Sequence, residues 1–357
     1  MPVRPLFATV AIRVAIGVGA LSALLLSLAV FGLSRPIDVR PGQIFVIESG
    51  TGIRKLARQL SAEGVLPVPE ALFEIAARLT AGQGYIQAGE YRLVRNFDVF
   101  ALLAHFRSGE VVRYKVTFPE GLRFDEWVKR LRDTPGLAHT IDAGSGAAVM
   151  RLLGEPGVSP EGQFYPDTYI YVRGDEDTAV LRAAYERMRA TLDTAWHARR
   201  RNLPLASPYA ALILASIVEK ETSRDEDRAN IASVFINRLR AGMRLQSDPT
   251  VIYGLHTFDG DLLRTHLRQR TPYNTYVIAG LPPTPISNPG SDAIRAVLDP
   301  PETLFLYFVA RGDGSSEFSA DLAAHNRAVT RFQRSGRAKG AVPAGVQQCV
   351  SLRGNSW

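Results

Sequence analysis

The sequence is poor in cysteine. Its 357 residues include only one, Cys349, so it can form neither an intrachain disulfide nor a zinc site built from several cysteines. The six histidines are scattered, and none belongs to an HExxH pair. The spacing of these residues gives no reason to expect a bound ion, and we predict neither a metal site nor a cofactor.

The central part of the chain also lacks an excess of basic charge. The net charge is +7, but this excess lies in residues 1–40 and 331–357, and residues 41–330 are nearly neutral. Proteins that bind nucleic acids neutralise phosphates with a basic surface. We therefore expect no nucleic-acid partner. A hydrophobic content of 46% is typical of folded proteins, and the length allows two domains or three small ones.

Residues 14–33 contain no charged side chain. As a helix this segment would extend about 30 Å, the thickness of the hydrocarbon core of a bilayer. A cleaved signal peptide has a shorter apolar region followed by a pair of small residues, whereas Ser-Arg-Pro follows here at residues 34–36. The pattern favours an uncleaved membrane anchor. The short segment before it favours a cytoplasmic N-terminus, although arginines flank the anchor on both sides.

Hydrophobic periodicity and turn residues divide the rest of the chain into elements. We expect strands at 44–47 and 86–94 and helices at 52–64, 69–80 and 98–107. A loop or short helix at 134–157 and an aromatic strand at 161–171 should follow. Further helices are expected at 176–202, at 207–221, and from a capping box of Ser223 and Glu226 to about 241.

One pattern occurs twice. Residues 45–60 and 116–131 both indicate a strand, a glycine turn and a helix, with Gly50 aligned to Gly121 and Leu56 aligned to Trp127. The first copy resembles a LysM module, a small βααβ unit that binds glycans containing N-acetylglucosamine. The alternative is a repeat that is merely structural.

The helix at 207–221 ends in two carboxylates. Residues 209–218 are almost entirely apolar, which indicates a helix enclosed in a core. Glu221 continues the stripe of Leu214, Ile217 and Val218, whereas Glu219 lies about 160° round the helix. Burial and the negative end of the helix dipole would both raise the pKa of such a carboxyl, as a general acid requires. The alternative is that both glutamates are solvated and pair with Lys220.

Three segments that follow are rich in amides, hydroxyls and tyrosines. Residues 243–250, 271–276 and 280–290 contain few helix formers, and proline and glycine make up more than half of the last one. Rigid loops of this kind suit sugars, because aromatic faces pack on rings while amides pair with hydroxyl and acetamido groups. The alternative is that they are structural turns.

Several motifs resemble those of the MltG/YceG-like endolytic murein transglycosylases. They include EGQFYPDTY, ASIVEKET, VFINRL, GMRLQSDPTVIYGL, YNTY, GLPP, ISNPG and LYFV, in the order of the family, across residues 45–330. Departures from the family pattern are small, at Pro160, Tyr165 and Ala320. The basic tail is not part of the pattern.

The resemblance implies a single-pass protein of the cell inner membrane whose periplasmic body cleaves uncrosslinked peptidoglycan strands internally. The family's catalytic glutamate is the second one of EKET, which is Glu221, and Glu219 is the reserve acid. One acid can protonate the bond between N-acetylmuramic acid and N-acetylglucosamine and then accept a proton as a 1,6-anhydro ring closes. The resemblance requires no metal or cofactor, and peptidoglycan synthases become candidate partners. The predicted substrate-binding residues are Gln246, Asp248, Tyr273, Asn274, Tyr276 and Asn288.

Two other functions remain open. A hydrolase would use the same glutamate with a second carboxylate, and Asp248 is the nearest candidate. Glu161 and Asp167 are further carboxylates, and we expect them to shape a loop. A glycan-binding scaffold without catalysis would depend on the LysM-like part alone.

The predicted fold is α+β with six parts. These are a short cytoplasmic segment, a transmembrane helix, a linker, a LysM-like domain, a mixed α+β catalytic domain and a disordered basic tail, at residues 1–13, 14–33, 34–43, 44–112, 113–332 and 333–357.

Overall fold

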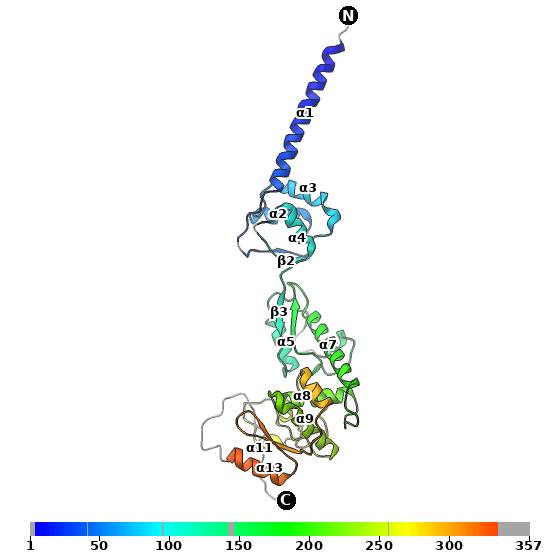
Figure 1. The fold of residues 1–357 in the computed structure, drawn as a ribbon, viewed down its shortest axis with the longest axis vertical. Coiled ribbons are helices and arrows are strands. Elements are labelled where there is room, and N and C mark those ends of the chain that lie inside the picture. Colours follow the sequence, from blue (N-terminus) through cyan, green and yellow to red (C-terminus); the bar gives the residue numbers. More distant parts are fainter. Residues whose placement is uncertain (1–3, 41, 95, 142–145, 256, 335–357) are drawn as a thin grey trace. The chain divides into compact units, whose positions relative to one another are not determined.

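The computed structural model describes residues 4–334 apart from 41, 95, 142–145 and 256 (Figure 1). Most of the predicted tail, with Cys349, lies outside the described residues. The chain divides into two compact units. Unit 1 comprises residues 1–114 and 170–175, and unit 2 comprises residues 115–169 and 176–357. Both contain helices and short strands, so the predicted α+β class is confirmed.

Unit 1 begins with an apolar helix, α1 (Arg4–Leu33). Residues Ile12–Leu33 are long and apolar enough to cross a membrane, by length and composition. The end of this helix joins the folded part, because Leu33 is buried in the same hydrophobic core as Ile37 and Val39. The backbone N–H of Ile37 donates to the carbonyl of Phe97 at 2.8 Å.

The rest of unit 1 has the predicted βααβ order. Strand β1 (Ile44–Ile47) pairs antiparallel with β2 (Gly89–Arg92), with Ile44 opposite Arg92. Between them lie α2 (Ile53–Ala62), α3 (Glu70–Leu79) and the 3₁₀ turn η1 (Ala81–Gln83), and α4 (Val99–Ser108) follows. Alternate strand residues and the apolar helix faces close the core, as period-2 and period-3.6 patterns require. Whether this unit binds glycans as LysM modules do stays a prediction.

Unit 2 is mainly helical. Its first part contains most of β3 (Tyr114–Thr117), α5 (Phe124–Arg132), α6 (Gly146–Leu152) and the first half of β4 (Thr168–Tyr171). Strands β3 and β4 are hydrogen-bonded as a two-stranded sheet. The central helices are α7 (Asp177–His197), α8 (Pro208–Glu221) and α9 (Asp225–Arg240). The last part contains α10 (Asp248–Gly254), α11 (Arg264–Arg268), α12 (Ser291–Leu298), the antiparallel strands β5 (Tyr307–Ala310) and β6 (Ser316–Ser319), α13 (Leu322–Val329) and the π-helical turn η2 (Thr330–Arg334).

The core of unit 2 is built around α8. Residues 211–218 of this helix are all buried, as its apolar sequence predicts. Helix α12 packs against both α8 and α9 and contributes Ile294 and Val297 to their shared core. Ser207 caps the start of α8 by accepting a hydrogen bond from the Ala210 N–H at 3.2 Å.

The predicted repeat is present in both units. Gly50 and Gly121 have φ angles of +76° and +77°, left-handed values that favour glycine. The aligned residues Leu56 and Trp127 are both fully buried, in different units. Trp127 stacks on Phe118 with ring centroids 3.7 Å apart.

Some expectations were wrong. The capping box of Ser223 and Glu226 is absent, because α9 begins after Arg224, whose side chain provides no cap. The Thr222 hydroxyl instead accepts from the Arg224 N–H at 3.0 Å. The helix expected over 176–202 ends earlier, at His197, and α10 begins within the segment 243–250 that was expected to be irregular.

The repeat generates a matched prediction. Leu56→Ala and Trp127→Ala should lower the free energy of unfolding by about 2–5 and 3–5 kcal/mol, because each removes a fully buried side chain. Each substitution should destabilise the unit that contains it. Hydrogen exchange measured by mass spectrometry during urea unfolding can show which unit loses protection. The exposed Leu79→Ala is the control, with an expected change within about 0.5 kcal/mol. A loss below about 1 kcal/mol for either core variant would contradict the packing described above.

Candidate active site

Glu221 lies at the last position of α8 and is half-buried. Its Oε1 accepts a hydrogen bond from the Ser247 hydroxyl at 2.5 Å. Ser247 is fully buried at the start of α10, and its N–H donates to the Thr275 hydroxyl at 2.9 Å. One carboxylate oxygen is therefore held by a hydroxyl that is itself fixed in the interior, which is the arrangement that positions a reacting group.

Gln246 precedes Ser247 and has an unusual backbone. Its φ of +53° is in the left-handed region, where residues other than glycine are uncommon. The Gln246 N–H donates to the Thr275 carbonyl at 3.2 Å, and Arg238 donates to its side-chain oxygen at 3.3 Å and to the Leu245 carbonyl at 2.7 Å. Such backbone strain is concentrated at functional sites. The Gln246 side chain is exposed beside Ser247, as a substrate-binding role would require.

Asp248 and Tyr276 are joined. The Tyr276 hydroxyl donates to Asp248 Oδ1 at 2.6 Å, and Asp248 is only 3% exposed. The pair fastens the start of α10 to the segment 271–276. Asp248 is therefore placed as a structural acceptor rather than as a carboxylate open to attacking water.

Two predicted substrate-binding residues are enclosed in the protein. Asn274 is fully buried, and its side-chain amide donates to the carbonyls of His266, Leu267 and Gln269 at 2.7–3.2 Å. Asn288 is also fully buried, and its side chain accepts from the Phe164 N–H and donates to the Leu122 carbonyl, both at 2.9 Å. Their burial argues against direct contact with a substrate, which stays a prediction. Asn274 pairs with carbonyls at the end of α11, and Asn288 joins the loops around Leu122 and Phe164.

Glu219, the reserve acid, points to another part of unit 2. Its Oε2 accepts from the Gly290 N–H at 3.0 Å, at the start of α12. Burial raises its pKa above the ordinary value, and the Gly290 hydrogen bond opposes that rise. Lys220 donates to the Gly121 carbonyl at 3.3 Å. The end of α8 thus ties to two separate loops.

The proline-rich segment 280–290 is non-helical, as predicted, and is fastened to α8. The Ser216 hydroxyl accepts from the Ile286 N–H at 3.0 Å, and the Ser287 hydroxyl donates to the Ser216 carbonyl at 3.2 Å. Tyr273 reaches this segment too, with its hydroxyl 2.9 Å from that of Thr284. A single buried serine in the middle of α8 therefore sets the position of the loop.

Glu161, which we expect from the sequence only to shape a loop, is a buried carboxyl. It accepts hydrogen bonds from the Phe124 N–H and the Tyr253 hydroxyl, both at 3.1 Å. Burial raises its pKa to about 7. Asp167 has a simpler role, an ion pair with Arg187 at 2.6 Å. Both carboxylates do fix local structure.

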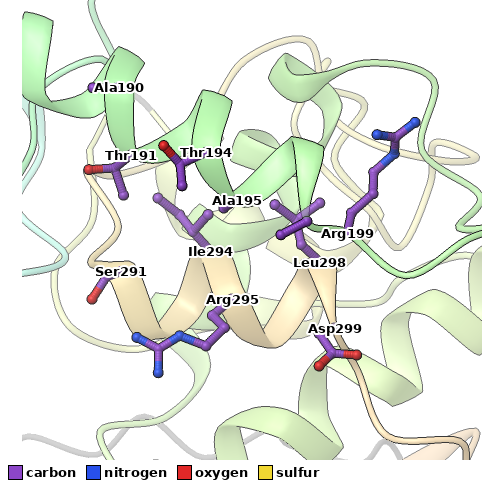
Figure 2. Close-up of a pocket in the computed structure, with 11 residues that line it drawn as sticks. Ala190, Thr191, Thr194, Ala195, Arg199, Ser291, Ile294, Arg295, Leu298 and Asp299 are labelled. Carbon is purple, nitrogen blue, oxygen red and sulfur yellow. The ribbon is translucent and has the colours of Figure 1, made fainter.

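A pocket of about 600 Å³ lies between α7 and α12. Figure 2 shows Ile294 and Leu298 of α12 pointing toward α7, with Arg199 and Arg295 at its edges. It contains none of the predicted site residues, so it does not define the candidate active site. Within the part of the chain that the structure describes, no group of three or more His, Cys, Asp or Glu side chains could hold a metal ion.

The model of the YceG-like family matches residues 45–331. The chain belongs to this family. It is similar to the endolytic murein transglycosylase of Bacillus subtilis, with 28% identity over 312 residues that cover 80% of this chain and 83% of the relative.

A second curated relative and a solved structure are also similar to this chain. The endolytic murein transglycosylase of Streptococcus pneumoniae serotype 2 is 26% identical over 304 residues, and the match spans 70% of this chain but about half, 51%, of that relative. The crystal structure of a YceG-like protein from Listeria monocytogenes has a TM-score of 0.51 and 28% identity. That match covers 80% of this chain and 99% of the other.

The buried Glu161 predicts a pH effect on stability. Its folded pKa of about 7 lies above the ordinary 4.5, so the folded state holds the proton more tightly and the contribution to stability falls as the pH rises between these values. Between pH 5 and pH 8 the free energy of unfolding of the wild type should fall by about 2–3 kcal/mol more than that of Glu161→Gln, whose side chain cannot titrate. Urea unfolding at both pH values measures the difference. Arg123, Asp125 and Tyr253 face this carboxyl and are unchanged in the variant. Equal pH slopes would contradict the prediction.

Proposed function

We propose that the protein is an endolytic murein transglycosylase that cleaves peptidoglycan strands with Glu221 as the acid. The observation that carries the proposal is the position of Glu221, at the end of a buried helix and with one oxygen held by Ser247. The family and the names of its relatives supply the substrate class. The family resemblance points to the same glutamate, and its ordered position at the end of α8 supports the proposal.

The reaction needs one carboxyl group that acts twice. Protonated Glu221 would give its proton to the glycosidic oxygen between N-acetylmuramic acid and N-acetylglucosamine, and the bond from muramic C1 to that oxygen breaks. The C6 hydroxyl of the same sugar then forms a bond to C1 and returns its proton to the Glu221 carboxylate. A 1,6-anhydro end results, and no water is consumed. This chemistry explains why one ordered carboxylate can suffice.

A hydrolase would need a second carboxylate to activate water. Asp248 was the candidate from sequence, but its burial and its bond from Tyr276 argue against that role. The hydrolase therefore remains the alternative with less support, and a glycan-binding scaffold would leave the ordered Glu221 without a purpose.

We also infer that α1 stays attached as a membrane anchor with the body in the periplasm. Leu33 at the end of this helix, and Ile37 and Val39 just after it, belong to the core of unit 1. Removal of the apolar segment by cleavage within this region would expose that core. Peptidoglycan strands are the partner that this placement allows, and synthases of those strands remain candidate partners.

The proposal predicts that Glu221→Gln abolishes cleavage, because the amide cannot donate the proton. The measurement is digestion of uncrosslinked glycan strands by the purified protein, with product masses determined by mass spectrometry. New ends should weigh one water less than hydrolysis products. Glu219→Gln, whose oxygen is committed to Gly290, should keep most activity. Unchanged cleavage by Glu221→Gln would refute the assignment, and hydrated ends would favour the hydrolase.

Ser247→Ala should lower kcat about 10- to 100-fold, because the carboxylate loses the hydroxyl that positions it. The KM should change much less. Steady-state kinetics on the same strands separate the two effects, and Ser291→Ala, on α12, is the matched control. A kcat equal to that of the wild type would mean that Ser247 does not orient the acid.

A further inference from the structure

A second group of polar and aromatic residues lies at the other end of α10 from Ser247. Tyr253 packs edge-on against Tyr273, with ring centroids 4.8 Å apart. The guanidinium of Arg123 lies 5.0 Å from the centroid of the Tyr253 ring. All three side chains are half-buried, so each keeps part of its surface open to solvent. The acid chemistry of Glu221 uses none of them.

Glu161 holds this group in place. One oxygen of its buried carboxyl accepts from the Tyr253 hydroxyl, and the other accepts from the N–H of Phe124, the residue after Arg123. The same carboxyl therefore fixes the tyrosine and the backbone next to the arginine. Gly254 contributes as well, because a Cβ at that position would lie 2.6 Å from the Thr271 hydroxyl oxygen and 3.1 Å from the Tyr273 Cβ. A glycine there lets the segment bearing Tyr273 approach α10 closely.

The distance of this group from the acid follows from the helix. Ser247, which is bonded to Glu221, precedes Tyr253 by six residues, and six residues of α-helix rise by about 9 Å. An enzyme that cleaves inside a strand must hold sugars beyond those at the broken bond. A binding surface one short helix away from the acid is placed to do this.

We propose that Arg123, Tyr253 and Tyr273 form an outlying subsite for an N-acetylated sugar ring of the glycan strand, with Glu161 as its positioning residue. The inference rests on the proposed function for its substrate class. Aromatic side chains offer an apolar surface for the ring, and the guanidinium can donate to hydroxyl and acetamido oxygens. The Tyr253 hydroxyl donates to Glu161, so it can only accept a hydrogen bond from the sugar. The subsite would strengthen binding of long strands and would leave the bond-breaking step unchanged.

A binding measurement tests the proposed subsite independently of catalysis. The probe is a hexamer of β-1,4-linked N-acetylglucosamine, titrated by calorimetry into the full-length protein in detergent. Tyr253→Ala and Arg123→Ala should each weaken binding about tenfold or more. Trp196→Ala is the matched control. Trp196 lies on α7, and the guanidinium carbon of Arg199 is 3.9 Å from the centroid of its ring, an arginine contact like that of Tyr253. Tyr253→Phe keeps the ring but loses the bond to Glu161, and it should fall between wild type and Tyr253→Ala.

Kinetics then separate a subsite from a structural role. On long strands Tyr253→Ala should raise KM about tenfold with kcat unchanged, and on fragments too short to reach from Glu221 to Tyr253 it should behave as wild type. Thermal unfolding checks that each variant is folded. Binding and KM within twofold of wild type would overturn the proposal, and so would an equal loss of kcat on short and long substrates.

The two proposals can fail separately. If the wild type cleaves strands but Tyr253→Ala binds the hexamer as tightly as the wild type, the subsite is refuted and the proposed function stands. If Tyr253→Ala weakens hexamer binding but the wild type cleaves no strands, the proposed function is refuted and the subsite stands.

Discussion

The candidate active site depends on the burial of one helix. Residues 211–218 of α8 are enclosed on all sides, so the helix has no freedom to rotate or slide in its core. Its polar end must then emerge at one fixed place. Ser216 within the buried part also anchors the proline-rich segment through Ile286 and Ser287. One packing constraint therefore places both the acid and one of the loops that follow it in the sequence.

The sequence predicted those features whose causes are local. An almost entirely apolar run that begins with the cap Ser207 and with Pro208 at the first helical position made α8 predictable. The glycine turns made the repeat predictable. What it missed depends on partners far apart in the chain. Ser247 contacts a glutamate 26 positions away, and Tyr253 contacts one 92 positions away. The left-handed backbone of Gln246 could not be predicted from the residue type, because glutamine does not favour that conformation.

Asn274 and Asn288 show why composition misleads at such sites. Polar residues in turn-rich segments suggested sugar-binding side chains. The Asn274 amide instead pairs with carbonyls at the end of α11, and the Asn288 amide pairs with backbone groups of two loops. Buried loops carry backbone donors and acceptors that must be paired. An asparagine is well suited to that task, because it both donates and accepts. The same chemistry therefore serves either substrate or scaffold, and burial decides which.

Three glutamates of unit 2 illustrate how environment divides one residue type into separate roles. Glu219 accepts a hydrogen bond from a backbone N–H at the start of α12, so loss of that acceptor oxygen would disturb a helix junction. Glu161 gives both oxygens to groups that carry an aromatic and arginine surface, and it is nearly enclosed. Glu221 is half-buried at a helix end, with a side-chain hydroxyl as the partner of one oxygen. A hydroxyl of this kind orients a carboxyl without enclosing it, and a group that must exchange protons with a large substrate needs both properties. This difference in surroundings, more than their spacing in the sequence, separates the proposed acid from the two glutamates that support structure.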